Sequence, residues 1–452
     1  MENTAKVSVR SRISQLCQSG IYRWVVLFII FIIYTLASAD RANLGMALPY
    51  IKKEFNLSHT DEGIIAGLFF TCYAIGQIPC GLIYRKATVR VVIAISAVCM
   101  SVSTWLVGHA TSAWFLKICR AVLGFSEAPL GIGCGTTINN WFPPREKGTA
   151  MGIYFAAMKC GPVIVPPVCA FIILTWGWRA LFIACAVPGV LFAVLWFLFI
   201  SSKPEDSRYV SQQELAHIRS EDTAGLNGQP EYHPQDRCPH WVDRMIRRKA
   251  LSRITTTSGV FLSWNIIGSA LGFLCMSGVI NTIMAWIPTY LMTDRGFSTV
   301  NTGFIAAAPF LGAVIGNMLG GIISDRVFVK RRKPLMMVSA ITTAVMMIFF
   351  TGLPSQPVYI AVFLFVVGVL LNLGYSAFVL FPTGLTDKEV YPLAYSLVNT
   401  GGSVGGALVP WLVGVLLDRS DWSHVFLFLS ACSLVCLLVV LTMSEPVAEK
   451  MS

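Results

Sequence analysis

Residues 22–48 read YRWVVLFIIFIIYTLASADRANLGMAL, and this stretch decides the fold class. No charged residue occurs between Trp24 and Ala39. A helix needs about 20 apolar residues to cross the hydrocarbon core of a bilayer, and the stretch is long enough to do so. The segment continues through Asp40 and Arg41, which stand side by side in apolar surroundings. It therefore predicts a membrane-spanning helix that carries two opposite charges at depth.

The rest of the chain repeats this apolar character. Of its 452 residues, 55% are hydrophobic and 13% are charged, whereas soluble domains carry about 25% charged residues. The composition therefore excludes a soluble protein and predicts an all-α membrane protein with twelve transmembrane helices. The expected spans are 22–48, 61–83, 89–108, 112–138, 148–173, 178–200, 259–292, 300–324, 334–353, 357–382, 390–417 and 422–443.

One long polar segment divides the chain into two halves. Residues 201–258 hold nine Lys/Arg and eight Asp/Glu, which predicts a cytoplasmic linker between six-helix bundles at 22–200 and 259–443, with tails at 1–21 and 444–452. The two bundles share an internal sequence repeat, since Pro166 precedes Trp178 by twelve residues and Pro410 precedes Trp422 by twelve. Parallel repeats of this kind are one transporter plan, in which the substrate site lies between the halves at the midplane.

The basic residues indicate the orientation in the membrane. If both termini are cytoplasmic, the cytoplasmic segments hold 25 of the 34 Lys/Arg and the outer loops hold 5, as the positive-inside rule requires. The formal net charge of +11 is then a topology signal, and no nucleic-acid partner is expected. The tripeptide Ala37-Ser38-Ala39 resembles a cleavage site, but the long apolar segment and the spans that follow predict an uncleaved first helix.

The thirteen cysteines predict neither disulfides nor a metal site. Most lie in or beside apolar segments, and the sequence contains no Cys-x-x-Cys motif and no cluster of cysteine with histidine. Cysteine in such segments behaves as a small hydrophobic residue. We therefore expect no metal and no cofactor other than a coupling ion.

Five charged residues fall deep within the expected spans. They are Asp40, Arg41, Arg120, Glu127 and Lys159. A charge at the bilayer centre costs about 2.5–3.5 kcal/mol on insertion scales, so each needs a partner or a function. Arg120 and Glu127 are seven residues apart and share a helix face. We expect each carboxylate to face an arginine across a helix gap.

These charges permit two interpretations. Ion pairs alone could lock the helices together. However, two acids and three bases leave one cation in excess, and a buried cation attracts an anionic substrate. Because a carboxylate beside an arginine can take up a proton when its partner leaves, Asp40 and Glu127 are the candidate proton-coupling residues. Lys159 is a candidate contact for the substrate anion, or else a partner for one of the two acids.

Several polar and aromatic residues fall at similar depth and suit the hydroxyl groups and carbon chain of a sugar acid. Each of them could equally serve as a contact between packed helices. The candidate substrate-binding residues are Tyr73, Gln77, Asn281, Trp286, Tyr290, Tyr375, Ser376 and Asn399.

Several motifs together carry a family resemblance that covers nearly the whole chain. They are Asp40-Arg41-Ala-Asn43, Phe70-x-x-Tyr73-x-x-x-Gln77-x-Pro79-x-Gly81, Arg120-x-x-Leu123-Gly124-x-x-Glu127-Ala128-Pro129, Trp141-Phe142-Pro143-x-Arg145-Glu146 and Gly177-Trp178-Arg179. The chain resembles the anion:cation symporter branch of the major facilitator superfamily, and within it the bacterial sugar-acid:proton symporters of the galactonate and hexuronate group.

The resemblance implies a function and roles for particular residues. It implies a symporter that imports a hexonate with protons across the bacterial inner membrane by alternating access. In that group, the residues that match Asp40 and Glu127 take up protons, and those that match Arg41 and Arg120 link protonation to the substrate. Those that match Tyr73 and Asn399 contact the sugar acid.

The sequence also departs from the family pattern at two places. A glutamine that often binds substrate hydroxyls in the family is missing near Met158, and the residue after Met158 is Lys159. Arg85 occupies the place of a usual aspartate in the first-half loop, whereas Asp325-Arg326 keeps the pattern in the second half. The missing glutamine leaves the identity of the sugar acid open, and Arg85 leaves open whether the gating bond that the usual aspartate makes is present.

Other functions remain as alternatives. The substrate could be a hexuronate or an aldarate such as glucarate or galactarate, and coupling to sodium is disfavoured because arginines stand beside both acids. A drug antiporter is a weaker hypothesis because cationic drugs would avoid three deep cations, and a non-transporting sensor because the central loop is too short for a typical signalling domain. A membrane-embedded enzyme is weaker because no catalytic motif occurs. The expected partners are a sugar-acid anion, a proton and the lipid bilayer, with the protein acting as a monomer.

Overall fold

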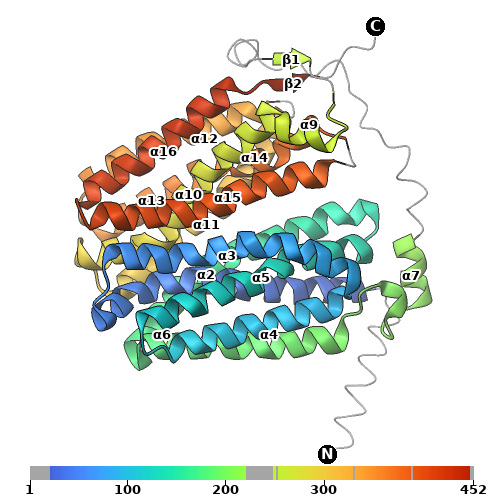
Figure 1. The fold of residues 1–452 in the computed structure, drawn as a ribbon, viewed down its shortest axis with the longest axis horizontal. Helices are drawn as coiled ribbons and strands as arrows, with labels where there is room; N and C mark the ends of the chain where they lie inside the picture. Colours follow the sequence, from blue (N-terminus) through green and yellow to red (C-terminus); the bar gives the residue numbers. More distant parts are fainter. Residues whose placement is uncertain (1–20, 220–247, 251–252, 329–330, 388–389, 448–452) are drawn as a thin grey trace, which may run out of the picture.

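The computed structural model describes residues 21–219, 248–250, 253–328, 331–387 and 390–447. Two groups of roughly parallel helices lie one against the other (Figure 1), with the early helices in blue to green and the later ones in yellow to red. The chain enters and leaves near the same end of the bundle, where α7 and the paired strands also lie.

The first group consists of five helical elements. They are α2 (Tyr22–Phe55), α3 (His59–Lys86), α4 (Val89–Gly108), α5 (Ala113–Trp141) and α6 (Pro144–Phe199). Two helices join within α6 at Gly177, whose φ of 84° and ψ of 168° interrupt the helical backbone. Glycine adopts a positive φ at little steric cost, so this residue allows the two helices expected at 148–173 and 178–200 to follow each other without a loop.

The second group contains the remaining membrane helices and two single-turn elements. Its members are α10 (Trp264–Thr293), α11 (Thr299–Arg326), α12 (Lys333–Phe349), η2 (Phe350–Gly352), α13 (Pro357–Leu373), α14 (Tyr375–Leu380), η3 (Phe381–Gly384), α15 (Tyr391–Leu417) and α16 (Trp422–Thr442).

Short elements of the linker join the two groups. They are η1 (Pro204–Asp206), α7 (Gln212–Arg219) and α9 (Thr257–Leu262), together with β1 (Arg248–Ala250), which pairs in parallel with β2 (Glu445–Val447). Figure 1 shows this strand pair above the second group. The sequence analysis did not anticipate the pair, because three residues are too few to give a strand pattern.

The number of membrane spans depends on the criterion. Within the described residues, nine helical segments are long and apolar enough to cross a membrane. The two helices that meet at Gly177 are counted as one of these nine, Thr149–Phe199. Helices α3 and α5 are of membrane length, with 28 and 29 residues, but are not among the nine. The predicted twelve spans therefore differ from this count at α3, α5 and α6.

The two groups meet through close backbone contacts as well as side chains. A Cβ atom on Gly67 of α3 would lie 2.6 Å from the carbonyl oxygen of Ala407 on α15. Only glycine permits this approach, and small residues at helix interfaces are typical of membrane bundles. Helix α2 packs likewise on α10, and α6 packs on α11. These three helix pairs form the interface between the halves.

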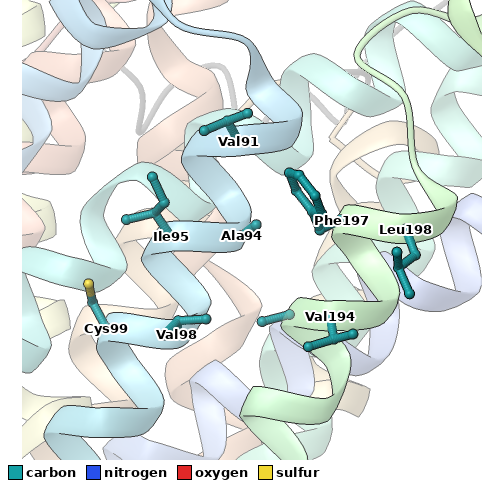
Figure 2. Close-up of a pocket in the computed structure, with 9 residues that line it drawn as sticks. Val91, Ala94, Ile95, Val98, Cys99, Val194, Phe197 and Leu198 are labelled. Carbon is teal, nitrogen blue, oxygen red and sulfur yellow. The ribbon is translucent and has the colours of Figure 1, made fainter.

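The outer surface of the bundle is apolar, as a lipid-facing surface must be. Phe28, Trp114 and Val358 are 62%, 72% and 70% exposed. A cavity of about 350 Å³ between α4 and α6 belongs to this surface, and Figure 2 shows that Val91, Ile95, Val98 and Phe197 line it with carbon atoms. Such a groove suits lipid chains and offers nothing to bind a sugar acid.

Candidate functional site

A buried ion pair joins α2 to α5 in the first half. The Nη2 atom of Arg41 donates to Oε1 of Glu127. The Glu127 side chain is 1% exposed and that of Arg41 is 16% exposed. The Arg41 guanidinium also lies 5.4 Å from the centre of the Tyr73 ring on α3. The predicted pairing of a deep carboxylate with an arginine across a helix gap therefore occurs at Glu127.

Arg120 lies beside this pair but makes a different contact. Its side chain is buried, and its Nη1 atom donates to the backbone carbonyl oxygen of Asp40 at 3.2 Å. The ring of Phe69 lies between the two arginines, with its centre 5.1 Å from the Arg120 guanidinium and 5.5 Å from that of Arg41. Aromatic faces attract cations, so Phe69 helps to hold both guanidinium groups within the membrane. The sequence analysis missed this residue, although it stands one helical turn from Tyr73.

The Asp40 carboxylate forms its hydrogen bonds with neutral groups. Its Oδ1 atom accepts from Nδ2 of Asn43 at 3.0 Å, and its Oδ2 atom accepts from Oγ1 of Thr104 on α4 at 3.1 Å. Arg120 lies close to the Asp40 carboxylate and acts on it through its charge, but no hydrogen bond joins the two side chains among the described residues, and Arg41 pairs with Glu127 instead. The reason is geometric, because consecutive residues on a helix point about 100° apart, and Arg41 takes the direction toward α5.

Three charged-group atoms at the site are buried without a hydrogen-bond partner among the described residues. They are Nε of Arg41, Nε of Arg120 and Oε2 of Glu127. Buried polar atoms are nearly always hydrogen-bonded, and leaving one unpaired is costly. The arrangement thus has spare donors for an anion and a spare acceptor for a proton.

Lys159 extends from the first half toward the second. Its Nζ atom lies 3.5 Å from Oδ1 of Asn372 on α13 and 4.9 Å from the centre of the Tyr375 ring on α14. The same Oδ1 atom accepts from Nδ2 of Asn317 on α11 at 3.3 Å. Lys159 therefore contacts neutral groups of the opposite half, which is where a substrate held between the halves would lie.

The other candidate residues are distributed along the interface. Tyr73, Gln77, Ser376 and Asn399 are half-buried. Asn281 donates to the carbonyl oxygen of Ser277 on its own helix at 2.8 Å.

Trp286 and Tyr290 lie apart from the charged groups. Nε1 of Trp286 donates to the Pro410 carbonyl oxygen at 3.1 Å, and the hydroxyl of Tyr290 accepts from Nε of Arg295 at 2.6 Å. Both rings pack on Trp422. Tyr290 stands nine residues beyond Asn281, or about 13 Å along the helix axis. Trp286 and Tyr290 therefore lie in an aromatic cluster near the helix end.

Two tyrosines that the sequence analysis did not select lie next to the ion pair. Tyr34 on α2 and Tyr154 on α6 are 3% and 5% exposed, and their ring centres are 4.6 Å apart. A Cβ atom on Gly131 would lie within 3.7 Å of three hydroxyls, those of Tyr34, Tyr73 and Tyr154. Since Gly131 stands one turn from Glu127, these hydroxyls adjoin the charged groups.

The described residues offer no metal site, since none of their His, Cys, Asp and Glu side chains gather in groups of three or more. The cysteines among the described residues are free thiols, and Cys17 and Cys238 lie outside those residues. The side chains of Arg85, Asp325 and Arg326 are likewise outside the description.

Comparison with known proteins identifies the family. A sequence model described as the Major Facilitator Superfamily matches residues 30–389 and 302–451. The chain belongs to this superfamily. Its members are transport proteins, and the chain is accordingly a multi-pass membrane transporter and not an enzyme.

Relatives within the superfamily agree with the resemblance found in the motifs. The "D-galactonate transporter" of Escherichia coli O6:H1 is 26% identical over 427 residues, which cover 92% of this chain and 94% of that protein. The "Probable galactarate/D-glucarate transporter GudP" of Bacillus subtilis is 25% identical over 439 residues, 94% of this chain and 92% of that protein. The "Probable L-galactonate transporter" of Escherichia coli K12 is 28% identical over 287 residues, 63% of this chain and 58% of that protein. The resemblance to galactonate and other sugar-acid transporters is confirmed.

Solved structures confirm the predicted fold class. A bacterial homolog of the human lysosomal transporter Spinster, in an inward-facing and occupied conformation, matches with a TM-score of 0.72 at 17% identity, covering 93% of this chain and 96% of that one. At this identity the match establishes the fold alone.

Proposed function

We propose that this transporter is a proton-coupled symporter that imports a hexonate sugar acid of the galactonate type, with L-galactonate as the first candidate. The relatives named for galactonate support the substrate class. The observation that carries the proposal is the buried Arg41–Glu127 pair, because the pair and Arg120 together have nitrogen and oxygen atoms that find no hydrogen-bond partner in the described part of the chain. The deep charges can therefore bind an anion and a proton in one site.

The proposed mechanism follows from the competition for Arg41. When Glu127 is ionised, it holds the Arg41 guanidinium. When Glu127 takes up a proton, its attraction for Arg41 falls, and the guanidinium becomes available to the substrate carboxylate. Binding of the proton and of the anion are thus coupled, since each favours the other. With both the proton and the anion bound, the Arg41–Glu127 pair and its ligands are neutral together, whereas either ligand alone leaves one unbalanced charge.

Lys159 and the polar residues around it give the proposed site its second side. A substrate carboxylate at Arg41 would extend its hydroxyl-bearing chain toward Asn372 and Tyr375, where Lys159 already crosses between the halves. A site built on hydrogen bonds rejects analogues that lack a hydroxyl, because its own groups are then left unpaired. We therefore expect hexonates to be transported and simple monocarboxylates such as lactate to be rejected.

The proposed location is the bacterial inner membrane, with both termini in the cytoplasm, where the positive-inside rule places the basic loops. The outside of that membrane is the more acidic side, so protonation would occur there. Each elementary charge that crosses 100 mV is worth about 2.3 kcal/mol. More than one proton per anion would therefore add an electrical driving force.

Uptake into proteoliposomes tests this function. Labelled L-galactonate should accumulate when the outside is acidic, with uptake rising as the outside pH falls from about 8 to about 6, within the range in which a perturbed carboxyl group titrates. A protonophore should abolish accumulation. Competition by a panel of six-carbon sugar acids then ranks the substrates. Sodium-dependent uptake without any pH dependence would refute the proposal.

An aldarate is the second candidate substrate, and Lys159 is the observation that favours it. Its Nζ atom lies near neutral partners in the opposite half, so it could receive the second carboxylate of glucarate or galactarate. The relative named for galactarate and D-glucarate is consistent with this alternative. Stronger competition by glucarate than by every aldonate in the panel would select it.

A further inference from the structure

A small cavity adjoins Asp40 inside the first half. Its volume is about 20 Å³, and its walls include Ala37 of α2, Ser101 of α4, and Cys185 and Gly189 of α6. A space of roughly 10–15 Å³ is enough to hold one water molecule if polar groups are present. Asp40 itself, the Ser101 hydroxyl and the Cys185 thiol supply polar atoms to the walls. The cavity therefore has both the size and the chemistry for a water.

This cavity lies on a different flank of α2 from the ion pair. Arg41 and Glu127 meet where α2 faces α5, whereas Asp40 bonds to Thr104 of α4. The lining residues come mainly from α2, α4 and α6 and include neither Arg41 nor any residue of the second half. A proton that reached Asp40 through the cavity would not pass the site between the halves.

The backbone at α6 keeps the cavity open. A Cβ atom at Gly189 would lie 2.2 Å from Oγ of Ser101, which donates to the carbonyl oxygen of Ala97 at 2.9 Å. A side chain at position 189 would therefore press on the cavity wall. Next to Asp40, the Oδ1 atom of Asn43 is buried and has no hydrogen-bond partner among the described residues. Asn43 does not line the cavity, but this atom shows that the hydrogen bonding around Asp40 is incomplete among the described residues.

We propose that this cavity binds a water molecule that passes the coupling proton to and from Asp40, on the α4 and α6 side of α2. In the forward step an O–H bond of a hydronium ion breaks, an O–H bond forms on the Asp40 carboxylate, and a neutral water remains. The reverse step returns the proton to that water. The inference rests on the proposed proton coupling and on the expectation, stated in the sequence analysis, that Asp40 is one of the two proton-coupling residues.

The groups around Asp40 set the charge balance of this step. Arg120 and Glu127 of α5 face it, as do the thiols of Cys169 and Cys185 on α6. From α4 the facing group is the neutral hydroxyl of Thr104. Arg120 is the nearby cation that remains when Asp40 is protonated, so binding of substrate at the arginines and protonation at Asp40 stay linked across α2.

Two variants from different helices fill the cavity. Ser101→Val replaces the hydroxyl with a branched apolar group, and Gly189→Ala adds a methyl group against Ser101. Val98→Leu is the matched control, since Val98 lies on α4 but faces the apolar groove shown in Figure 2. The exchange of the Asp40 carboxyl proton for deuterium is followed by infrared spectroscopy, and the Asp40 band is identified by its loss in Asp40→Asn.

Both filled variants should exchange this proton several-fold more slowly than the wild type and the control, while counterflow of labelled sugar acid continues. Unchanged exchange in the filled variants would overturn the proposal. A measurement on the unmodified protein needs no variant: saturation with the best sugar acid should slow proton exchange at Glu127 several-fold more than at Asp40, because the substrate covers Glu127 but not the cavity. Equal slowing at both would also overturn it. If Asp40→Asn still accumulates substrate uphill, the role of Asp40 in the proposed function has failed instead.

Discussion

The Glu127 carboxylate is held by Arg41 on one oxygen and has no described partner on the other. Removing its charge while keeping its shape should therefore separate transport from proton coupling. In Glu127→Gln, Arg41 is permanently available to the substrate, and no proton is bound or released at this position. We expect exchange of labelled substrate across proteoliposomes to persist, while uphill uptake driven by a pH gradient is lost.

The control for this prediction is Glu62→Gln. Glu62 is as deeply buried as Glu127, but it bonds to Lys52 and His59 near the helix end. That variant should retain pH-driven accumulation. Normal accumulation by Glu127→Gln would show that the coupling proton binds elsewhere.

The position of Lys159 suits contact with the substrate rather than with the coupling proton. Its contacts are neutral groups in α13 and α14, so its replacement leaves no carboxylate unpaired. Lys159→Met keeps much of the side-chain volume and should raise the apparent KM several-fold with little change in kcat, since the lost interaction concerns binding. A substrate panel in which no KM changes would assign Lys159 to packing. Lys117→Met is a suitable control, because Lys117 lies near the start of α5 and pairs there with Asp61.

At the scale of single residues, the sequence singled out the rare charged residues within the membrane spans but predicted their partners only in part. Charges are so costly in a membrane that Arg41, Arg120 and Glu127 could be selected by rarity alone, and the structure places them together. The Thr104 partner of Asp40 could not be predicted, because it depends on how α2 is rotated against α4, whereas the Asn43 partner lies one helical turn away on α2 itself. Trp286 and Tyr290 have the residue types of a sugar site, but aromatic residues pack among themselves equally well. Phe69, Tyr34 and Tyr154 were missed for the same reason.

Helix ends show a recurring device at the scale of elements: a carboxylate from elsewhere in the chain caps a helix N-terminus. Glu214 of α7 accepts from the backbone nitrogens of Tyr22 and Arg23 at the start of α2. Glu445 accepts from the corresponding nitrogens of Arg332 and Lys333 at the start of α12. The first N–H groups of a helix lack internal partners and carry positive partial charge. These carboxylates therefore fix extramembrane segments to the membrane helices.

We expect Glu214→Ala to lower the stability of the first half by about 1 kcal/mol, the usual cost of losing a cap. The buried Glu214 also bonds to the Arg23 side chain at 3.3 Å, so the variant loses that contact as well. Thermal unfolding in detergent measures the change. Glu205→Ala is the control from the same linker, because Glu205 forms an exposed pair with Arg219, and exposed pairs contribute little. Equal melting temperatures for the two variants would contradict the capping role.

Asp418 forms the same kind of cap between the halves. Its carboxylate follows α15 and accepts from the backbone nitrogens of His59 and Thr60 at the start of α3, both at 2.8 Å. Burial tends to raise the pKa of Asp418, but the hydrogen bonds from Thr60 and His59 outweigh it and hold that pKa below its ordinary value of 3.8. The Asp418 cap therefore makes its full contribution to keeping the two halves closed at this end when the pH is above 3.8. This contribution is lost only as the pH falls through the lowered pKa of Asp418.

Asp418→Ala should consequently weaken the closure of this end by about 1 kcal/mol, or about fivefold in the population open there. Because both pH 6 and pH 8 lie above the ordinary value of 3.8, the effect should be the same at the two. Substrate binding from the outer face of vesicles should tighten accordingly. Asp421→Ala, which removes the exposed cap of α16, should leave it unchanged. An effect that appears only at pH 6 would point to a different titrating group.

The elements were predictable where the apolar runs were long. The boundaries of α4 and α16 and the start of α2 follow from such runs, whereas α2 continues to Phe55, seven residues beyond the expected end. The meeting of two helices at Gly177 falls within the expected gap between 173 and 178. The short elements were not predictable, since α7, β1 and β2 depend on contacts between distant segments. The Glu214 cap is an example, because it joins residues 192 positions apart.

At the scale of the whole molecule, the two halves are joined chiefly at the end where α2 finishes and α3 begins. Tyr50 shares a hydrogen bond with Thr299 there, and Asp418 caps α3 at the same end. The proposed topology places this end outside the cell. The structure then corresponds to a transporter closed toward the outside, and the pair of halves must separate there before a substrate can enter.

Gly67 offers a direct test of this closure. Because a Cβ atom at position 67 would lie 2.6 Å from the Ala407 carbonyl oxygen, Gly67→Val should keep α3 and α15 apart and hold the molecule open at the outer end. Transport should be lost, while binding of labelled sugar acid from the outside persists or tightens, because the competent state is already populated. Right-side-out vesicles measure that binding, and inside-out vesicles should show its loss. Gly321→Val is the matched control, since a Cβ atom at position 321 meets no atom within 4 Å. Retained transport by Gly67→Val would mean that α3 and α15 need not approach this closely during the cycle.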